Sequence, residues 1–360
     1  MITTADARRA AQAWLQEEAP KYPGLVGAVL AGSTSRRDPS TPHPAGSDVD
    51  LFLYVDAEVP SDILEPRGRF APRKLAFRGV VLEPSFHNAR ILADPETVLG
   101  DRHLAPLFTE PCILLDPSGR LASLAAAVTP EFFRRRHAQR RLTQVLEAAT
   151  PAALPFAVPD TPALRAPCWR NVAFAFSVMR CAQAVLAADL RYPTTRRSFV
   201  VAREVLAPAR RDDLADELLR LLGSLDLARA EVENLAAETE HTYDVTINAR
   251  RTPVPMEWNI SHDARELERA AIRELIDAGH HREALFQLLL VRTVAQGILE
   301  NDGTESVRES SRLDYRRLLS ALGIDGDTAL ASRAQAIRAF MPCLRETCER
   351  LLAHAPGLQD

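Results

Sequence analysis

The first third of the chain carries two short apolar runs with a strand-like pattern. They extend from Leu25 to Ala31 and from Val49 to Val55, and a polar spacer rich in proline separates them. From Val49 onward the second run alternates, which predicts a β-strand with two distinct faces. One face would carry Val49, Leu51, Leu53 and Val55, and the other would carry Asp48, Asp50, Phe52 and Tyr54.

Other patterns complete the expected fold. Residues 3–18 have the spacing of an amphipathic helix that packs on a sheet, with Trp14 in the core. The run Cys112–Leu115 reads as the last strand of the sheet, because Asp116-Pro117-Ser118-Gly119 matches a type I turn. Beyond Thr129 apolar residues recur with a period near 3.6, which predicts a helical region. The predicted helices cover about 130–149, 163–190, 195–207, 211–223, 226–241, 263–278, 282–301, 312–322 and 328–353.

The predicted fold class is therefore α+β. A small mixed β-sheet domain is expected over residues 1–128, followed by an all-α domain over residues 129–360. Four prolines between residues 151 and 162 mark the longest linker of the helical part.

Asp48 and Asp50 are the first candidates for chemistry. Their backbones would lie roughly 6.6 Å apart along one strand face, so their carboxylates could share a pair of cations about 3.5 to 4 Å apart. Asp is depleted in strands, and like charges on one face repel, which favours a metal site over a solvated edge strand. Gly32 would let the backbone approach a phosphate closely, and Ser33 offers a hydroxyl and a backbone N–H as anion donors.

A hydrophobic strand, then Gly32-Ser33, then Asp48-Val49-Asp50 on the next strand resembles the DNA polymerase β-like nucleotidyltransferase superfamily. The spacer here departs from that pattern, because it is longer and contains Pro39, Pro42 and Pro44, which disfavour a continuous helix. The resemblance implies a mixed-sheet domain that binds a nucleoside triphosphate through Gly32 and Ser33.

The resemblance also implies a third carboxylate from a neighbouring strand, acting as a metal ligand or as a base. Glu83 fits that place, because a strand over GVVLEPSF would put it on one face with Val81 and Ser85. Glu65 is the rival and falls in an expected loop. The expected cofactors are two Mg²⁺ ions held by Asp48, Asp50 and Glu83, with an NTP donor, ATP being the first expectation.

The resemblance extends by architecture to small-molecule nucleotidyltransferases of the aminoglycoside or lincosamide type, which modify antibiotics. In such enzymes a cation at the start of a helix in the second domain reaches the triphosphate. Arg197 could fill that role, with Arg196 as the alternative, although the lysine of the family is absent here. The expected reaction is transfer of an NMP to a hydroxyl of a small molecule, with release of pyrophosphate.

Two other functions stay open. The acceptor could be a protein or an RNA end, or the chain could be a binding protein of the same fold without turnover. A continuous basic groove would favour a macromolecular acceptor. The acidic stretch Glu231, Glu233, Glu238 and Glu240 could line a pocket for a polycation, or could simply form a solvated helix face.

Composition and charge indicate the expected partners and location of the protein. The 360 residues carry a formal net charge of −4, and only Lys21 and Lys74 are lysines, so a nucleic-acid partner is not expected. The five cysteines form no Cys-x-x-Cys pair, which favours a reduced cytoplasmic location. No stretch of about 18 uninterrupted apolar residues indicates a membrane span. The oligomeric state is not predicted.

Two further motifs invite a functional interpretation. Five arginines and one histidine between residues 134 and 141 could bind RNA or a triphosphate, but a salt-bridged helix face is the expected role. Arg273 and His280 have the loose spacing of a helical endoribonuclease motif. Ribonuclease chemistry is not expected, because Gly279 would end the helix before His280.

Overall fold

A computed structural model of the protein describes residues 2–57, 59, 73–150 and 166–360. By packing, the chain forms two compact units, which are described separately. The first comprises Met1–Arg141, Ser261–Ala271 and Gln359–Asp360, and the second comprises Leu142–Ile260 and Ile272–Leu358. The sequence pattern changes from strands to helices at residues 128 and 129, within the first unit.

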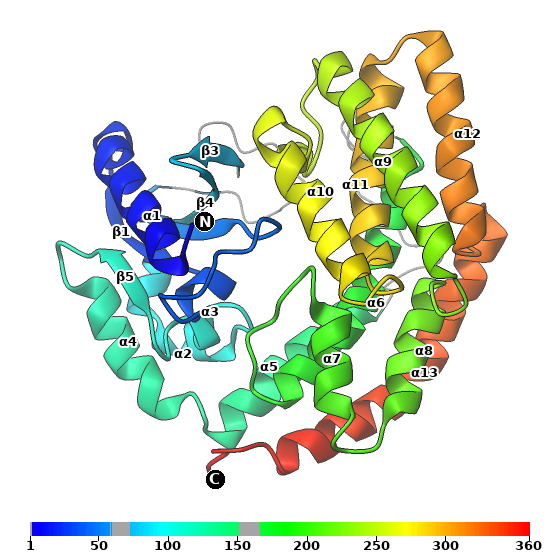
Figure 1. The fold of residues 1–360 in the computed structure, drawn as a ribbon. Coiled ribbons are helices and arrows are strands. Elements are labelled where there is room, and N and C mark those ends of the chain that lie inside the picture. The colour runs from blue at the N-terminus through cyan, green and yellow to red at the C-terminus, as the bar shows by residue number, and fades with distance from the viewer. Residues whose placement is uncertain (1, 58, 60–72, 151–165) are drawn as a thin grey trace. The chain divides into compact units, whose positions relative to one another are not determined.

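The first unit contains a mixed β-sheet with helices on both faces (Figure 1). Among the described residues, the strands lie in the order β3-β4-β2-β1-β5; β2 and β4 are parallel, and the other neighbours are antiparallel. The elements of this unit up to residue 131 are α1 (Thr4–Glu18), β1 (Leu25–Leu30), β2 (Val49–Val55), β3 (Leu75–Phe77), β4 (Val80–Asn88), α2 (Pro95–Gly100), α3 (Leu104–Leu107), β5 (Cys112–Leu115) and α4 (Arg120–Glu131).

The two faces predicted for β2 are confirmed. Val49, Leu51, Leu53 and Val55 are fully buried in a core that α1 covers, and Trp14 lies in that core at 3% exposure. Tyr54 faces a second core, which α2, α3 and α4 cover. Because both faces of the strand are buried beyond residue 52, only its first residues are left to carry polar chemistry.

Helix α1 is fixed at both its cap and its neighbouring loop. Thr3 and Asp6 form a capping box, in which each side chain accepts from the backbone N–H of the other. The spacer with three prolines packs along the start of this helix, since Thr4 N–H donates to Thr41 O at 2.8 Å and Ala5 N–H donates to Pro39 O at 2.9 Å. Backbone hydrogen bonds therefore hold the proline-rich spacer against the start of α1.

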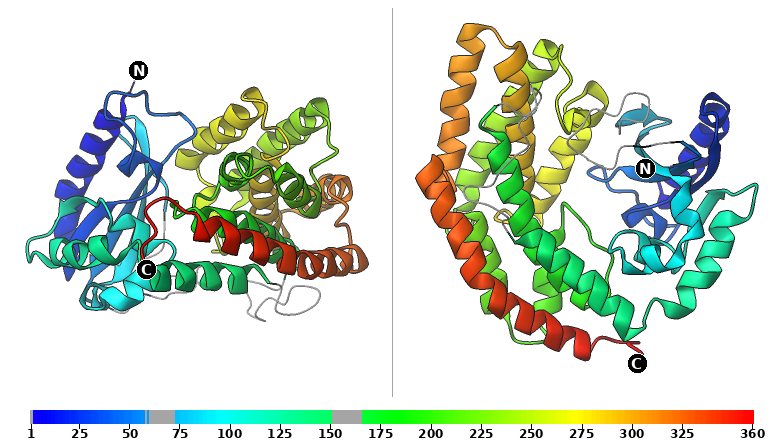
Figure 2. Two further views of the ribbon diagram at one scale, coloured as in Figure 1. Left: turned by 90° about the horizontal axis from the view of Figure 1, so that it is seen from below. Right: turned by 180° about the vertical axis from the view of Figure 1, so that it is seen from behind.

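The second unit is all-helical in its described part. Its core helices are apolar on nearly every side: the first fifteen residues of α11 are all buried, and α6 is buried along most of its length. Helix α13 packs along α6 and α8, and α9 packs along α11 (Figure 2). The helices from residue 135 onward are α5 (Arg135–Ala149), α6 (Trp169–Ala188), α7 (Ser198–Leu206), α8 (Asp212–Leu222), α9 (Arg229–Ala249), α10 (His262–Asp277), α11 (Leu285–Asp302), α12 (Glu305–Ala321) and α13 (Asp327–Ala353).

Sequence reasoning gave the α+β class correctly but misplaced several helices. It missed α2 and α3, because helices of six and four residues show little periodicity. It also missed α4, although the buried Leu121, Leu124, Ala125 and Val128 have helical spacing. Helix α5 begins at Arg135, not at residue 130, and α12 begins at Glu305, not at residue 312. The start of α12 was missed because its first two turns are polar and show no apolar periodicity.

Helix α6 is the only described helix whose length and composition would allow it to cross a membrane. Of its most apolar window, 78% is buried inside the protein, which is typical of a core helix.

Candidate metal and nucleotide site

Three carboxylates meet where β2 and β4 begin. The two strands are parallel, and their register pairs Asp50 with Glu83. Asp48 directly precedes β2 and, by strand alternation, projects from the same face as Asp50. One oxygen from each of Asp48, Asp50 and Glu83 lies within 4.8 Å of the others. The sheet thus brings together the three site residues that the sequence singled out.

Gly32 lies directly beneath one of these carboxylates. Its backbone has φ +63° and ψ −160°, and a Cβ placed on it would lie 1.8 Å from Asp50 Oδ2. Only glycine fits here, both because of the backbone conformation and because of the contact. Ser33 follows at the start of a short 3₁₀ turn, Ser33–Ser35, and is exposed. The turn therefore begins beside the carboxylates, as the Gly-Ser signature implies.

Hydrogen bonds fix this turn to the strand and to α1. Ala31 N–H donates to Asp50 O at 2.9 Å, and the Thr34 hydroxyl donates to Asp48 O at 3.3 Å. The Arg8 guanidinium of α1 donates to the carbonyls of Thr34, Ser35 and Arg37 at 3.0, 3.2 and 2.6 Å. A single arginine thus holds two carbonyls of the turn and one just after it, which fixes this backbone next to the acidic cluster.

The electrostatic environment of Glu83 is unusual. Burial raises the pKa of this carboxyl well above its usual range, and the negative charges of Asp48 and Asp50 raise it further. The charge of Lys74 opposes these effects. A carboxyl with a raised pKa, next to two others, is typical of a functional site.

Lys74 and Glu268 belong to the site, although sequence reasoning gave neither of them a role. The Lys74 ammonium lies 2.6 Å from Glu268 Oε1, 3.3 Å from Asp48 Oδ2 and 3.7 Å from Glu83 Oε2. Glu268 lies on the part of α10 that belongs to the first unit. The rarity of lysine in this chain was the one available signal for Lys74, whereas no local pattern marks Glu268.

The donor set suits a hard divalent cation. All three converging ligands are carboxylate oxygens, which Mg²⁺ prefers over nitrogen and sulfur. Burial raises the pKa of Glu83 most, the negative charges of Asp48 and Asp50 raise it further, and a bound cation would offset that repulsion between carboxylates. The residues present therefore fit Mg²⁺.

Two other predicted site residues stay predictions. Glu65, the rival third carboxylate, lies outside the described residues. Arg197 is exposed in the second unit, directly before α7, and its role at a triphosphate stays a prediction.

The arginines around the start of α5 have structural contacts. Arg141 is 3% exposed, donates to Leu99 O and Phe132 O at 2.9 and 2.8 Å, and stacks on the Phe132 ring. Arg136 pairs with Glu131 at 3.1 Å. These contacts agree with the expected salt-bridged face.

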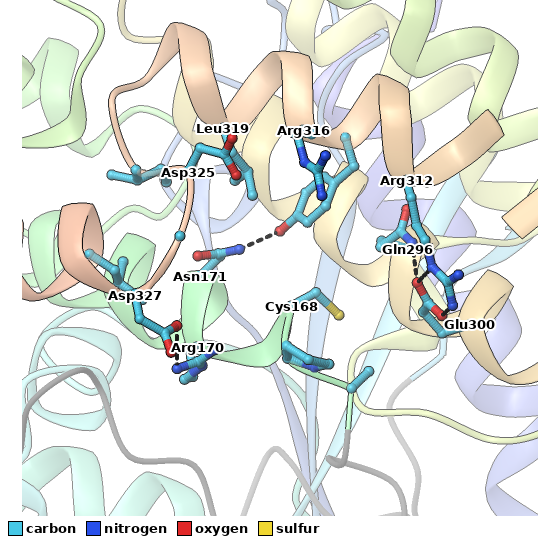
Figure 3. Close-up of a pocket in the computed structure, with 16 residues that line it drawn as sticks. Cys168, Arg170, Asn171, Gln296, Glu300, Arg312, Arg316, Leu319, Asp325 and Asp327 are labelled. Carbon is cyan, nitrogen blue, oxygen red and sulfur yellow. Dashed lines mark hydrogen bonds and ion pairs between the residues drawn. The ribbon is translucent and has the colours of Figure 1, made fainter. Parts of the chain in front are cut away.

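The second unit holds a pocket of about 290 Å³ between α6, α11, α12 and α13, which both apolar and charged side chains line (Figure 3). Asn171 donates to the buried Tyr315 hydroxyl at 2.9 Å, and Arg312 forms a two-point contact with Glu300. Arg170 pairs with Asp327 at 2.7 Å across another part of the lining. Most charged groups of this pocket thus have partners within the protein.

No protein-family model matches the chain, and a search of curated proteins finds no match.

Proposed function

We propose that this protein is a Mg²⁺-dependent nucleotidyltransferase that moves an NMP, in the first instance AMP from ATP, to a hydroxyl of a small molecule. The observation that carries the proposal is the convergence of Asp48, Asp50 and Glu83 within 4.8 Å, next to a glycine that admits no side chain. Carboxylates and a backbone turn in this arrangement suit a metal-bound triphosphate.

Each residue has a distinct expected task. Asp48, Asp50 and Glu83 would hold Mg²⁺, which when bound would neutralise phosphate charge and lower the pKa of the acceptor hydroxyl. Gly32 and Ser33 would receive the β- and γ-phosphates through the backbone of the turn. Arg8 keeps that backbone in place through its three carbonyl contacts.

The reaction is a single in-line displacement. The acceptor oxygen would form a bond to the α-phosphorus as the bond from that phosphorus to the α,β-bridging oxygen breaks, and pyrophosphate would leave with those electrons. Glu83 would take the roles that the resemblance implies for the third carboxylate, as a ligand of Mg²⁺ or as the base that accepts the hydroxyl proton. Arg197 would assist the triphosphate from the second unit, which would choose the acceptor.

A nucleotide-binding protein without turnover is the second candidate. Lys74 favours it, since an ammonium that neutralises two of the carboxylates can hold the cluster together without supporting transfer. Such a protein would bind NTP and release no pyrophosphate.

The test is incubation with Mg²⁺ and each of the four NTPs against a panel of hydroxyl acceptors, read by pyrophosphate release and product mass. Asp48→Ala and Asp50→Ala should each lower the rate about a thousandfold or more. Asp56→Asn is the matched control, because Asp56 follows the same strand and is exposed. An Asp50 variant that turns over near the parental rate would refute the assignment.

A further inference from the structure

Lys74 is a buried cation among carboxylates. Its side chain and that of Glu268 are each 2% exposed, and the ammonium lies 2.6 Å from the Glu268 oxygen. The same nitrogen is at ion-pair distance from Asp48 Oδ2 and Glu83 Oε2, at 3.3 and 3.7 Å. Lys74 is thus fixed on one side by Glu268 and contacts two of the three metal-ligand candidates on the other.

The residue type is informative. The chain has 44 lysines and arginines in total, of which only two are lysines. An ammonium is a compact point charge, whereas guanidinium is a planar fork that pairs with one carboxylate at two points. A site that needs a small cation shared by several oxygens would therefore use lysine, even in a chain that otherwise uses arginine.

Space in the cluster is limited by the same contacts. Two divalent ions in such a site lie about 3.5 to 4 Å apart and share carboxylates. Lys74 already contacts two of those carboxylates, and a desolvated ammonium repels a second divalent ion strongly, because charges interact more strongly away from water. Glu268 keeps the ammonium from moving away, since both side chains are buried and face each other.

We propose that Lys74, positioned by Glu268, serves as the second cation of the site, so that the chain binds one divalent ion where the sequence resemblance implies two. The inference rests on the proposed function for the metal site itself. Asp48 and Glu83 would then be shared between one ion and the ammonium. In this role Lys74 is a positioning residue that sets the number of ions and the orientation of their ligands.

The experiment counts ions without relying on turnover. Mn²⁺ is titrated into the full-length protein with and without an α,β-methylene analogue of ATP and followed by EPR, in which two neighbouring Mn²⁺ ions give an exchange-coupled spectrum. The wild type should bind one Mn²⁺ per chain with an uncoupled spectrum. The double variant Lys74→Met/Glu268→Gln, which leaves neither buried charge without its partner, should bind two with a coupled spectrum.

Matched controls and outcomes complete the test. Lys21→Met removes the other lysine, which is exposed and pairs with Glu18, and Glu266→Gln changes an exposed glutamate on α10. Both should bind one ion, as the wild type does. Two coupled ions in the wild type, or a single ion in the double variant, would overturn the role of Lys74 and leave the nucleotidyltransferase proposal standing. If no Mn²⁺ binds to the wild type, both proposals fail.

Discussion

Gly32 and Asp50 are in such close contact that each determines where the other can be. The Gly32 backbone has a conformation that only glycine adopts readily, and the Asp50 carboxylate fills the space where a side chain would begin. A methyl group at this position must displace either the turn or the carboxylate. Changes at Gly32 should therefore affect stability and metal binding together.

We expect Gly32→Ala to lower the free energy of unfolding by more than the roughly 1 to 3 kcal/mol that such a sparsely populated backbone conformation costs, because the clash adds to the strain. Mn²⁺ affinity should fall as well. Denaturant unfolding and metal titration measure the two effects. Gly119→Ala is the control, since Gly119 has φ +71° with no atom within 4 Å of an added Cβ. Equal losses in both variants, with unchanged Mn²⁺ binding, would contradict this account.

His137 gives the chain a dependence of stability on pH. It is 2% exposed, and burial lowers the pKa of its imidazole below the usual value. Its neutral ring accepts a hydrogen bond from Arg136 Nε at 3.0 Å, which a protonated ring could not accept. As the pH falls below about 6.5, the unfolded chain takes up a proton more readily than the folded one, so stability decreases.

The expected result is a decrease of at most about 1.4 kcal/mol per pH unit from this residue, read from urea unfolding between pH 7 and pH 5. His137→Gln should flatten the curve in that window. His354→Gln, at an exposed histidine, should leave the slope unchanged. A slope that is the same in wild type and His137→Gln would remove His137 as the cause.

At the scale of elements, α1 does more than cover the sheet. Through Arg8 it supplies the donors that hold the carbonyls of the Ser33–Ser35 turn and of Arg37. The turn is therefore positioned by a helix that contributes no ligand of its own. Such outer contacts typically tune a site about 10- to 100-fold.

Arg8→Ala should raise the KM for NTP by roughly tenfold with a smaller change in kcat, because the turn that receives the phosphates loses its support. Steady-state kinetics at varied NTP would measure the split. Arg9→Ala is the neighbouring control, since Arg9 is exposed and pairs only with Asp6 among the described contacts. A drop in kcat with an unchanged KM would place Arg8 elsewhere in the mechanism.

Strands β1, β2, β4 and β5 and the acidic face of β2 could be predicted because strand alternation is local. Strand β3 was missed, because its three residues are too few to show a pattern. The same alternation placed Glu83 correctly, and parallel pairing of β2 with β4 then gave the cluster. Helices α2 and α3 could not be predicted, because helices of six and four residues depend on tertiary packing and show little periodicity. Glu268 was beyond reach for another reason: its partner lies 194 residues away.

At the scale of the molecule, the first unit is not a continuous stretch of sequence. Residues 261–271 belong to it, together with Gln359 and Asp360. The backbone of Gln359 pairs with the backbones of Phe133 and Arg135. Glu268, which contacts Lys74, therefore belongs to the same unit as the carboxylates although it follows residue 128 by 140 positions.

A fragment ending at Thr150 tests this division. It should bind Mg-NTP weakly, if it folds, and should transfer to no acceptor, because it lacks both the helical unit and Glu268. Full-length Glu268→Gln separates the two causes: we expect it to retain transfer at a rate reduced about 10- to 100-fold. Full transfer by the fragment, measured as product mass, would show that the helical unit is an accessory and would favour a macromolecular acceptor.

The Lys74–Glu268 contact also sets the order in which the site can form during synthesis of the chain. During translation the strands of the first unit leave the ribosome well before residue 268, since 194 residues separate the two partners. At about 5 to 20 residues per second, Glu268 is synthesised roughly 10 to 40 s after Lys74. During that interval the nascent sheet lacks the contact between Lys74 and Glu268. The site therefore reaches its final form only after most of the helical unit has been made.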